Sequence, residues 1–273
     1  MDGIVFYNAG RKCIVRLAVS ISTLVKHCSS PIAILSDSDG YDQCSRVAQS
    51  FGVRVIPANF ERDTNKNWVL LNKCRLHQVT PYDRTLFFDS DTIFLSNVVD
   101  AFSYLDDHEF IVTQFANWLT KGRHYRKRIE NWRGILSDEV VDRAYTEQRA
   151  INTGFYGWRK GAKIFDTWYD TTKLNRTTFI PDEIACQILL PGYDYKIIDD
   201  RYNYSCRLTK IIKGVKVLHY HGRKHCRLSD DKYVFNSDRW YSEFDKVRQL
   251  PVIEDNIQYD KQLRTYLRLR DAL

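Results

Sequence analysis

Short apolar runs alternate with longer amphipathic segments through the first third of the chain. The runs at residues 4–7, 32–35 and 53–56 have the length of strands. The segments at 13–27 and 41–51 predict helices. In the first, apolar residues recur at three- and four-residue spacing, which is the pattern of a helix that packs on a sheet. Because parallel strands need such crossovers, the pattern predicts an α/β fold.

The next pair of elements ends in an acidic motif. A helix predicted at 67–79 is stopped by Thr80-Pro-Tyr-Asp, and a strand at 85–88 leads directly into Asp89-Ser90-Asp91. Ligands of open α/β sheets bind outside the carboxyl ends of the strands. Two alternate carboxylates at such an end suit one hard cation, Mg²⁺ or Mn²⁺, although Asp is also common in plain turns.

Later elements follow the same pattern with weaker signals. Strands are predicted at 110–114, 155–158, 195–198 and 215–218, and helices at 162–171 and 184–190. From residue 229 the sequence turns polar, and residues 259–270 predict a basic C-terminal helix. We therefore divide the chain into an α/β domain, residues 1–228, and a mainly helical extension, residues 229–273.

Composition places the chain among ordinary folded proteins. Of 273 residues, 44% are hydrophobic and 27% charged. The first residues lack a secretory signal pattern, and no apolar stretch reaches membrane-spanning length, so we expect a cytoplasmic protein that is soluble or peripheral. Seven cysteines without a Cys-x-x-Cys pair predict reduced thiols rather than a zinc cage or a disulfide framework.

Positive charge is concentrated in two stretches. The net charge is +7, and residues 201–229 contain Arg and Lys but neither Asp nor Glu, so this stretch is expected to meet an anion. The second stretch, residues 121–128, mixes basic and aromatic side chains. It fits phosphates, acidic glycans or an anionic membrane surface, but equally a solvated face.

A cluster of histidines and cations follows the strand predicted at 215–218. Residues 217–225 read Val-Leu-His-Tyr-His-Gly-Arg-Lys-His. A histidine here suits a third metal ligand, and Arg223 and Lys224, with backbone amides near Gly222, suit phosphates. A single histidine after a strand is more often structural, but three in this run weaken that alternative.

The block at residues 71–94, which joins the helix, turn, strand and Asp-Ser-Asp motif, resembles glycosyltransferase family 8, the glycogenin-like and lipopolysaccharide galactosyltransferase-like enzymes. The resemblance covers roughly residues 3–225. It implies the GT-A fold, with a mostly parallel central sheet flanked by helices, a UDP-sugar donor, Mn²⁺ or Mg²⁺, and retention of anomeric configuration. It also implies that Asp89, Asp91 and His219 bind the metal.

The same resemblance assigns further residues to the donor. The turn after the first strand, with the end of the second, would cradle uracil and ribose, and a basic side chain would lie near the diphosphate. The positions implied are Tyr7, Asn8, Ala9, Asp37, Lys73, Ser90, Gly222, Arg223 and Lys224. Lys73 is otherwise an exposed helix lysine, and the motif after Gly222 lacks the Pro and Trp usual in the family.

Three residues are implied to act on the transferred sugar. Asn152 matches an asparagine beside the donor sugar, with a simple turn as the alternative. Asp182 matches an aspartate that binds sugar hydroxyls, and Glu183 stands where the family has a glutamine near the reacting carbon. The plain alternative for the acidic pair is a helix N-terminus after Pro181.

Other activities remain open on these residues. An inverting transferase could use Asp182 or Glu183 as base. A nucleotidyltransferase shares the sheet, nucleotide and metal but needs a longer glycine-rich loop than residues 8–12 offer. A sugar-nucleotide-binding or glycan-binding module without activity is the third alternative. The acceptor is expected to be a glycan, glycolipid or protein rather than nucleic acid, and a homodimer is left open.

Overall fold

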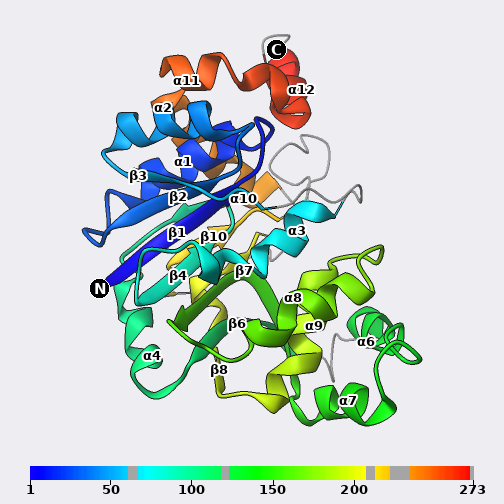
Figure 1. Ribbon diagram of the computed structural model, residues 1–273. Coiled ribbons are helices and arrows are strands. Elements are labelled where there is room, and N and C mark those ends of the chain that lie inside the picture. The colour runs from blue at the N-terminus through cyan, green and yellow to red at the C-terminus, as the bar shows by residue number, and fades with distance from the viewer. Residues whose placement is uncertain (61–66, 118–122, 207–212, 222–233, 271–273) are drawn as a thin grey trace. The chain divides into compact units, whose positions relative to one another are not determined.

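The chain alternates strands and helices and forms two compact units. The computed structural model describes residues 1–60, 67–117, 123–206, 213–221 and 234–270 (Figure 1). Unit 1 comprises Met1–Gly3, Phe60–Phe87 and Asp100–Asp200. Unit 2 comprises Ile4–Asn59, Phe88–Val99 and Arg201–Leu273.

The larger sheet has seven strands in the order β3-β2-β1-β4-β7-β6-β8. Strands β1, β2 and β3 run parallel, and β6 runs parallel to β8 but antiparallel to β7. These pairings, with helices between the strands, confirm the predicted α/β class. The strands are β1 (Asp2–Asn8), β2 (Ile32–Ser36), β3 (Arg54–Pro57), β4 (Arg84–Phe88), β6 (Phe110–Asn117), β7 (Arg149–Arg159) and β8 (Tyr195–Ile198).

Unit 2 also holds a small sheet in the order β5-β10-β9 and most of the long helices. Strand β10 is antiparallel to β5 and parallel to β9. Neither β5 nor β9 was predicted, because two or three residues carry no periodic signal. The elements are β5 (Thr92–Phe94), β9 (Tyr204–Ser205), β10 (Val217–His219), α1 (Ile14–Leu24), α2 (Tyr41–Phe51), α10 (Val234–Val247), α11 (Pro251–Glu254) and α12 (Lys261–Arg270).

Helix α1 is buried on nearly every side, which differs from the amphipathic helix expected. It contacts α2, α10, α11 and β5, so its polar positions lie inside as well. Ser20, Ser22 and Thr23 are at most 3% exposed. Their hydroxyls are satisfied internally: Ser22 and Thr23 donate to backbone carbonyls one turn back, and Thr23 also accepts from Phe94 N at 3.0 Å.

The C-terminal segment of unit 2 is bonded to α1 and α2 through paired charges. Arg16 of α1 donates two hydrogen bonds to Asp260, at 2.8 and 3.2 Å, and Asp260 is 1% exposed. Arg46 of α2 pairs with Asp255 at 2.8 Å. The described part of residues 229–273 is mainly helical, and its separation from residues 1–228 as a domain stays a prediction.

Unit 1 has an aromatic core between its sheet strands and helices. Phe110, Tyr156, Trp158 and Trp168 are at most 1% exposed, and Tyr156 stacks on Trp158 at 5.4 Å. Helix α9 packs on β7 and on α8. The helices are α3 (Trp68–Lys73), α4 (Tyr104–Asp107), α6 (Arg123–Glu130), α7 (Asp138–Arg143), α8 (Phe165–Leu174) and α9 (Pro181–Leu189).

Most predicted elements differ from the observed ones by at most three residues at an end, and two differ more. The helix expected at 67–79 is α3 followed by a separate 3-10 turn, Leu76–Gln78, and the strand expected at 155–158 begins at Arg149. Further 3-10 turns lie at Val99–Ser103, Ala144–Thr146, Leu190–Gly192, Asp200–Tyr202 and Ile257–Tyr259. Within the described ranges, none of the helices has both the length and the apolar character needed to cross a bilayer.

Candidate functional site

The acidic loop after β4 is anchored through its backbone. The Thr92 hydroxyl donates to the Asp89 carbonyl at 2.9 Å and lies 2.7 Å from the Ser20 hydroxyl of α1. Tyr220 N donates to the Asp91 carbonyl at 2.8 Å. The buried face of α1 and the end of β10 therefore fix the position from which both carboxylates extend.

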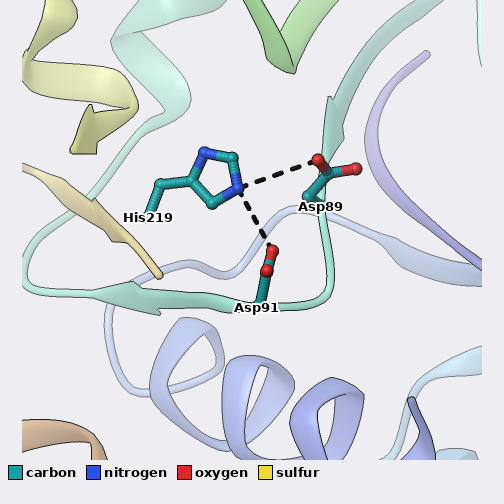
Figure 2. A group of neighbouring side chains, drawn as sticks. All are labelled: Asp89, Asp91 and His219. Atoms are coloured by element: carbon teal, nitrogen blue, oxygen red, sulfur yellow. Dashed lines mark ion pairs between the residues drawn. The ribbon is translucent and has the colours of Figure 1, made fainter. Parts of the chain in front are cut away.

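His219 completes a three-residue cluster with these carboxylates (Figure 2). It lies on β10 directly opposite Thr92 of β5, within the strand that was predicted to end one residue earlier. Its Nε2 atom is 3.1 Å from Asp91 Oδ1 and 3.7 Å from Asp89 Oδ2. The side chain is only 3% exposed, and Nδ1 has no hydrogen-bond partner among the described residues.

The cluster has the composition and spacing of a divalent-cation site. One ligand atom from each residue lies within 4.8 Å of the others. Ligands that share an ion at bond lengths of about 2.1 Å lie roughly 3 Å apart, as the shorter contact does. Two carboxylate oxygens and one imidazole nitrogen suit Mn²⁺ or Mg²⁺, whose positive charge would also offset the repulsion between the carboxylates.

The neighbouring His221 is engaged elsewhere. Its Nε2 atom lies 2.5 Å from the Ser205 hydroxyl on β9, and its ring centroid is 4.9 Å from that of His219. The geometry therefore distinguishes the two histidines, and His219 alone joins the two aspartates within the described residues.

A second group in unit 2 surrounds the turn after β1. Asp37 Oδ1 accepts from the backbone N–H groups of Gly10 and Gly40, at 2.9 and 2.8 Å. Asn8 Nδ2 donates to the Gly10 carbonyl at 2.7 Å, while Asn8 Oδ1 is buried without a partner among the described residues. A Cβ at Gly40 would lie 2.8 Å from Asn8 Nδ2, so the close approach requires glycine.

The carboxylates of unit 1 form a buried network at the start of α9. Glu183 Oε2 accepts from Asn152 Nδ2 at 3.0 Å and from Thr153 N at 3.3 Å. Asp182 Oδ2 accepts from the Thr153 hydroxyl at 3.2 Å and lies 3.7 Å from Lys73 Nζ. Asp182, Glu183 and Lys73 are 1%, 7% and 6% exposed.

Burial and like charge act together on Glu183. Burial raises the pKa of Glu183 to about 8, and the adjacent Asp182 adds to the rise. The Thr153 N–H and the positive charge of Lys73 oppose it without cancelling it. With Asp182 paired to Lys73, the network at neutral pH holds a neutral Glu183, which is a hydrogen-bond donor and a poor proton acceptor.

Two alternatives from the sequence are wrong. Lys73 is not an exposed helix lysine, because it is buried, paired with Asp182 and placed 5.3 Å over the Phe87 ring. Asn152 is not in a simple turn, because it lies on β7 where the pairing with β6 shifts register. A β-bulge re-aims side chains, which accounts for the inward direction of Asn152.

The other implied residues are placed as follows. Tyr7 is buried at the end of β1, Ala9 lies in the next turn, and Ser90 is half-buried between the two aspartates. Gly222, Arg223 and Lys224 lie outside the described residues. The anchoring hydroxyls of Ser20 and Thr92 were not predicted from the sequence. For Ser20, the sequence does offer a signal, because hydroxyl residues recur inside an otherwise apolar helix.

No family model and no curated sequence matches this chain. Its fold is nevertheless that of GT-A glycosyltransferases of solved structure. The galactosyltransferase LgtC, solved with donor and acceptor sugar analogs, is 14% identical with a TM-score of 0.65, covering 90% of this chain and 96% of that one. Another structure of LgtC, with the same coverage, is an active-site mutant in which Gln is replaced by Glu.

Two further structures share the fold. Mouse xyloside xylosyltransferase 1 is 11% identical with a TM-score of 0.58, covering 81% of this chain and 98% of that chain. The glycosyltransferase GlyE of Streptococcus pneumoniae is 15% identical with a TM-score of 0.56, covering 92% of this chain and 64% of the longer GlyE.

Proposed function

We propose that this chain is a metal-dependent glycosyltransferase that moves a sugar from a UDP-sugar to an acceptor with retention of anomeric configuration. The observation that carries the proposal is the convergence of Asp89, Asp91 and His219 in unit 2. The fold supports it, because LgtC, which shares this fold, is a galactosyltransferase solved with donor and acceptor sugar analogs. The family that the Asp89-Ser90-Asp91 block resembles uses a UDP-sugar and Mn²⁺ or Mg²⁺.

Unit 2 would hold the nucleotide. Asp89, Asp91 and His219 would hold the cation, which supplies stabilisation of the negative charge that develops on the departing diphosphate. Asn8 would direct its buried Oδ1 atom to a donor group of the base or ribose, since this acceptor has no partner among the described residues. Asp37 would keep that turn rigid through its two backbone bonds.

Unit 1 would hold the transferred sugar. Asp182, ionised beside Lys73, would accept hydrogen bonds from sugar hydroxyls, and Asn152 would position Glu183. A Glu183 that stays protonated below about pH 8 resembles the family's glutamine in charge and makes a poor general base. This favours retention over an inverting displacement.

The acceptor would be a glycan, glycolipid or protein, and the reaction would take place in the reducing cytoplasm. The described cysteines 13, 28, 44, 74, 186 and 206 are all free, which agrees with a reducing compartment. Burial raises the pKa of the Cys44, Cys74, Cys186 and Cys206 thiols, so they are structural rather than reactive.

A panel of UDP-sugars, each with and without Mn²⁺, tests the proposal through the release of UDP. We expect at least one donor to release UDP only with metal, and the double variant Asp89→Asn/Asp91→Asn to lose both this release and Mn²⁺-dependent UDP binding in calorimetry. Asp107→Asn, an exposed site on α4, is the matched control. Metal-dependent UDP binding that survives in the double variant would contradict the metal assignment.

A further inference from the structure

The loop between α8 and α9 presents an aromatic ring to water although its backbone is firmly held. Phe179 is 66% exposed. Asn67 Nδ2 donates to the carbonyls of Arg176 and Thr178, at 2.8 and 2.9 Å. The Thr178 hydroxyl donates to the Asn175 carbonyl at 2.8 Å. The exposure of Phe179 is therefore a property of a well-anchored loop.

The same loop ends in a strained residue. Ile180 has φ 48° and ψ 57°, a left-handed conformation that a β-branched residue rarely adopts. It is followed directly by Pro181, the first residue of α9, and by Asp182. Backbone strain is typical of functional positions when the surrounding structure maintains it, as the bonds from Asn67 do for this loop.

Arg128 of α6 connects the exposed ring to that network. Its guanidinium carbon lies 4.6 Å from the centroid of the Phe179 ring, so the cation stacks on one face. The same charge is among those that oppose the rise in the pKa of Glu183. The charge of Arg128 is therefore near enough to affect Glu183, and the Phe179 ring is bound to that same cation.

Further basic residues are close in sequence to Arg128 and Phe179. Arg126 and Lys127 are exposed on α6 next to Arg128, Lys173 is exposed on the last turn of α8, and Arg176 is half-exposed in the loop. A guanidinium that stacks through its face keeps its N–H edges for a bidentate bond to a carboxylate or phosphate. The uncovered face of a phenyl ring packs on the C–H face of a pyranose.

We propose that Phe179 and Arg128 form a subsite for a sugar that carries a carboxylate or phosphate, the ring lying on Phe179 and the anion on Arg128. That the bound sugar is the acceptor of the transfer reaction rests on the proposed function. Anionic saccharide binding by these two residues does not, because it needs only the geometry and charge of unit 1.

Saturation-transfer difference NMR on the full chain tests the subsite with three methyl glycosides. Methyl β-D-glucuronide carries a carboxylate, methyl β-D-glucoside 6-phosphate carries a phosphate, and methyl β-D-glucoside is the neutral match. We expect one or both anionic probes to bind more tightly than the neutral one. Phe179→Ala and Arg128→Gln should each weaken this binding by roughly fivefold or more. The controls are Ile135→Ala and Arg143→Gln, at exposed positions of unit 1.

Equal binding of the neutral glycoside, or anionic binding unchanged in both variants, would overturn the subsite. Metal-dependent UDP release without acceptor is measured on the same samples. If metal-dependent UDP release persists and the two variants bind the anionic saccharide normally, the subsite is refuted and the transferase proposal stays intact. Charge-selective binding that is lost in the variants, with no UDP release from any donor, supports the subsite and refutes the transferase.

Discussion

Replacing Glu183 by glutamine should change how the stability of the protein depends on pH. The amide introduced by Glu183→Gln keeps an acceptor oxygen for Asn152 Nδ2 and Thr153 N, and it cannot ionise. In the native protein the carboxyl has a pKa of about 8, against 4.5 as its ordinary value. Between these two values the folded protein holds a proton that the unfolded chain has released.

The sign and the size of the effect follow from that proton. The neutral carboxyl contributes fully to the free energy of unfolding below about pH 4.5, and this contribution is lost as the pH rises toward 8. In this window the free energy of unfolding of the parent should fall, relative to Glu183→Gln, by up to about 1.4 kcal/mol per pH unit. From pH 5 to pH 7 the variant should gain roughly 2–3 kcal/mol on the parent.

Urea unfolding at pH 5, 6, 7 and 8, followed by tryptophan fluorescence, measures this difference. The signal reports mainly on unit 1, in which Trp132, Trp158 and Trp168 are buried, with Trp240 buried in unit 2. Glu139→Gln, at an exposed position of α7, controls for the loss of a carboxylate. If the parent and Glu183→Gln give parallel profiles from pH 5 to pH 8, the buried carboxyl does not hold the proton and the reasoning is refuted.

Three further outcomes are expected. His219→Ala should weaken Mn²⁺ binding, measured by electron paramagnetic resonance, more than His221→Ala, because His219 is the histidine that clusters with both aspartates among the described residues. A larger loss at His221 would reverse the assignment. Asp182→Asn should lower the free energy of unfolding by about 3–5 kcal/mol in urea titrations, because Lys73 is left buried without its counter-ion, and unchanged stability would refute that pairing. Glu183→Gln should keep substantial UDP-sugar turnover and, by product NMR, the donor's anomeric configuration; an inverted product would contradict retention.

Local patterns predicted the strands and helices of the first third of the chain and the acidic loop. Strand β4 and Asp89-Ser90-Asp91 are adjacent in sequence, so an apolar run followed by two carboxylates was sufficient. His219 is a different case. Its place beside Asp91 depends on the pairing of β10 with β5, which the sequence shows only through the family resemblance.

Burial was the least predictable property. A lysine in a helix is expected from the sequence to be exposed, but Lys73 is buried. Its partner Asp182 lies on a helix that is far away in sequence. Helix α1 shows an apolar stripe, but α10 and α11 cover its other side, so Ser20 became an internal anchor for Thr92. Tertiary packing decides whether such residues are buried, and the periodicity within one helix does not predict that packing.

The segmented make-up of unit 2 sets an order of events during synthesis on the ribosome. Arg16 and its partner Asp260 are 244 positions apart, and His219 is translated long after the aspartates that it faces. Residues 100–200 of unit 1 emerge before the last segment of unit 2. Until that segment follows, α1 has an uncovered apolar surface, which is where a nascent chain attracts chaperones. The cluster of Asp89, Asp91 and His219 is therefore expected to be completed late in maturation.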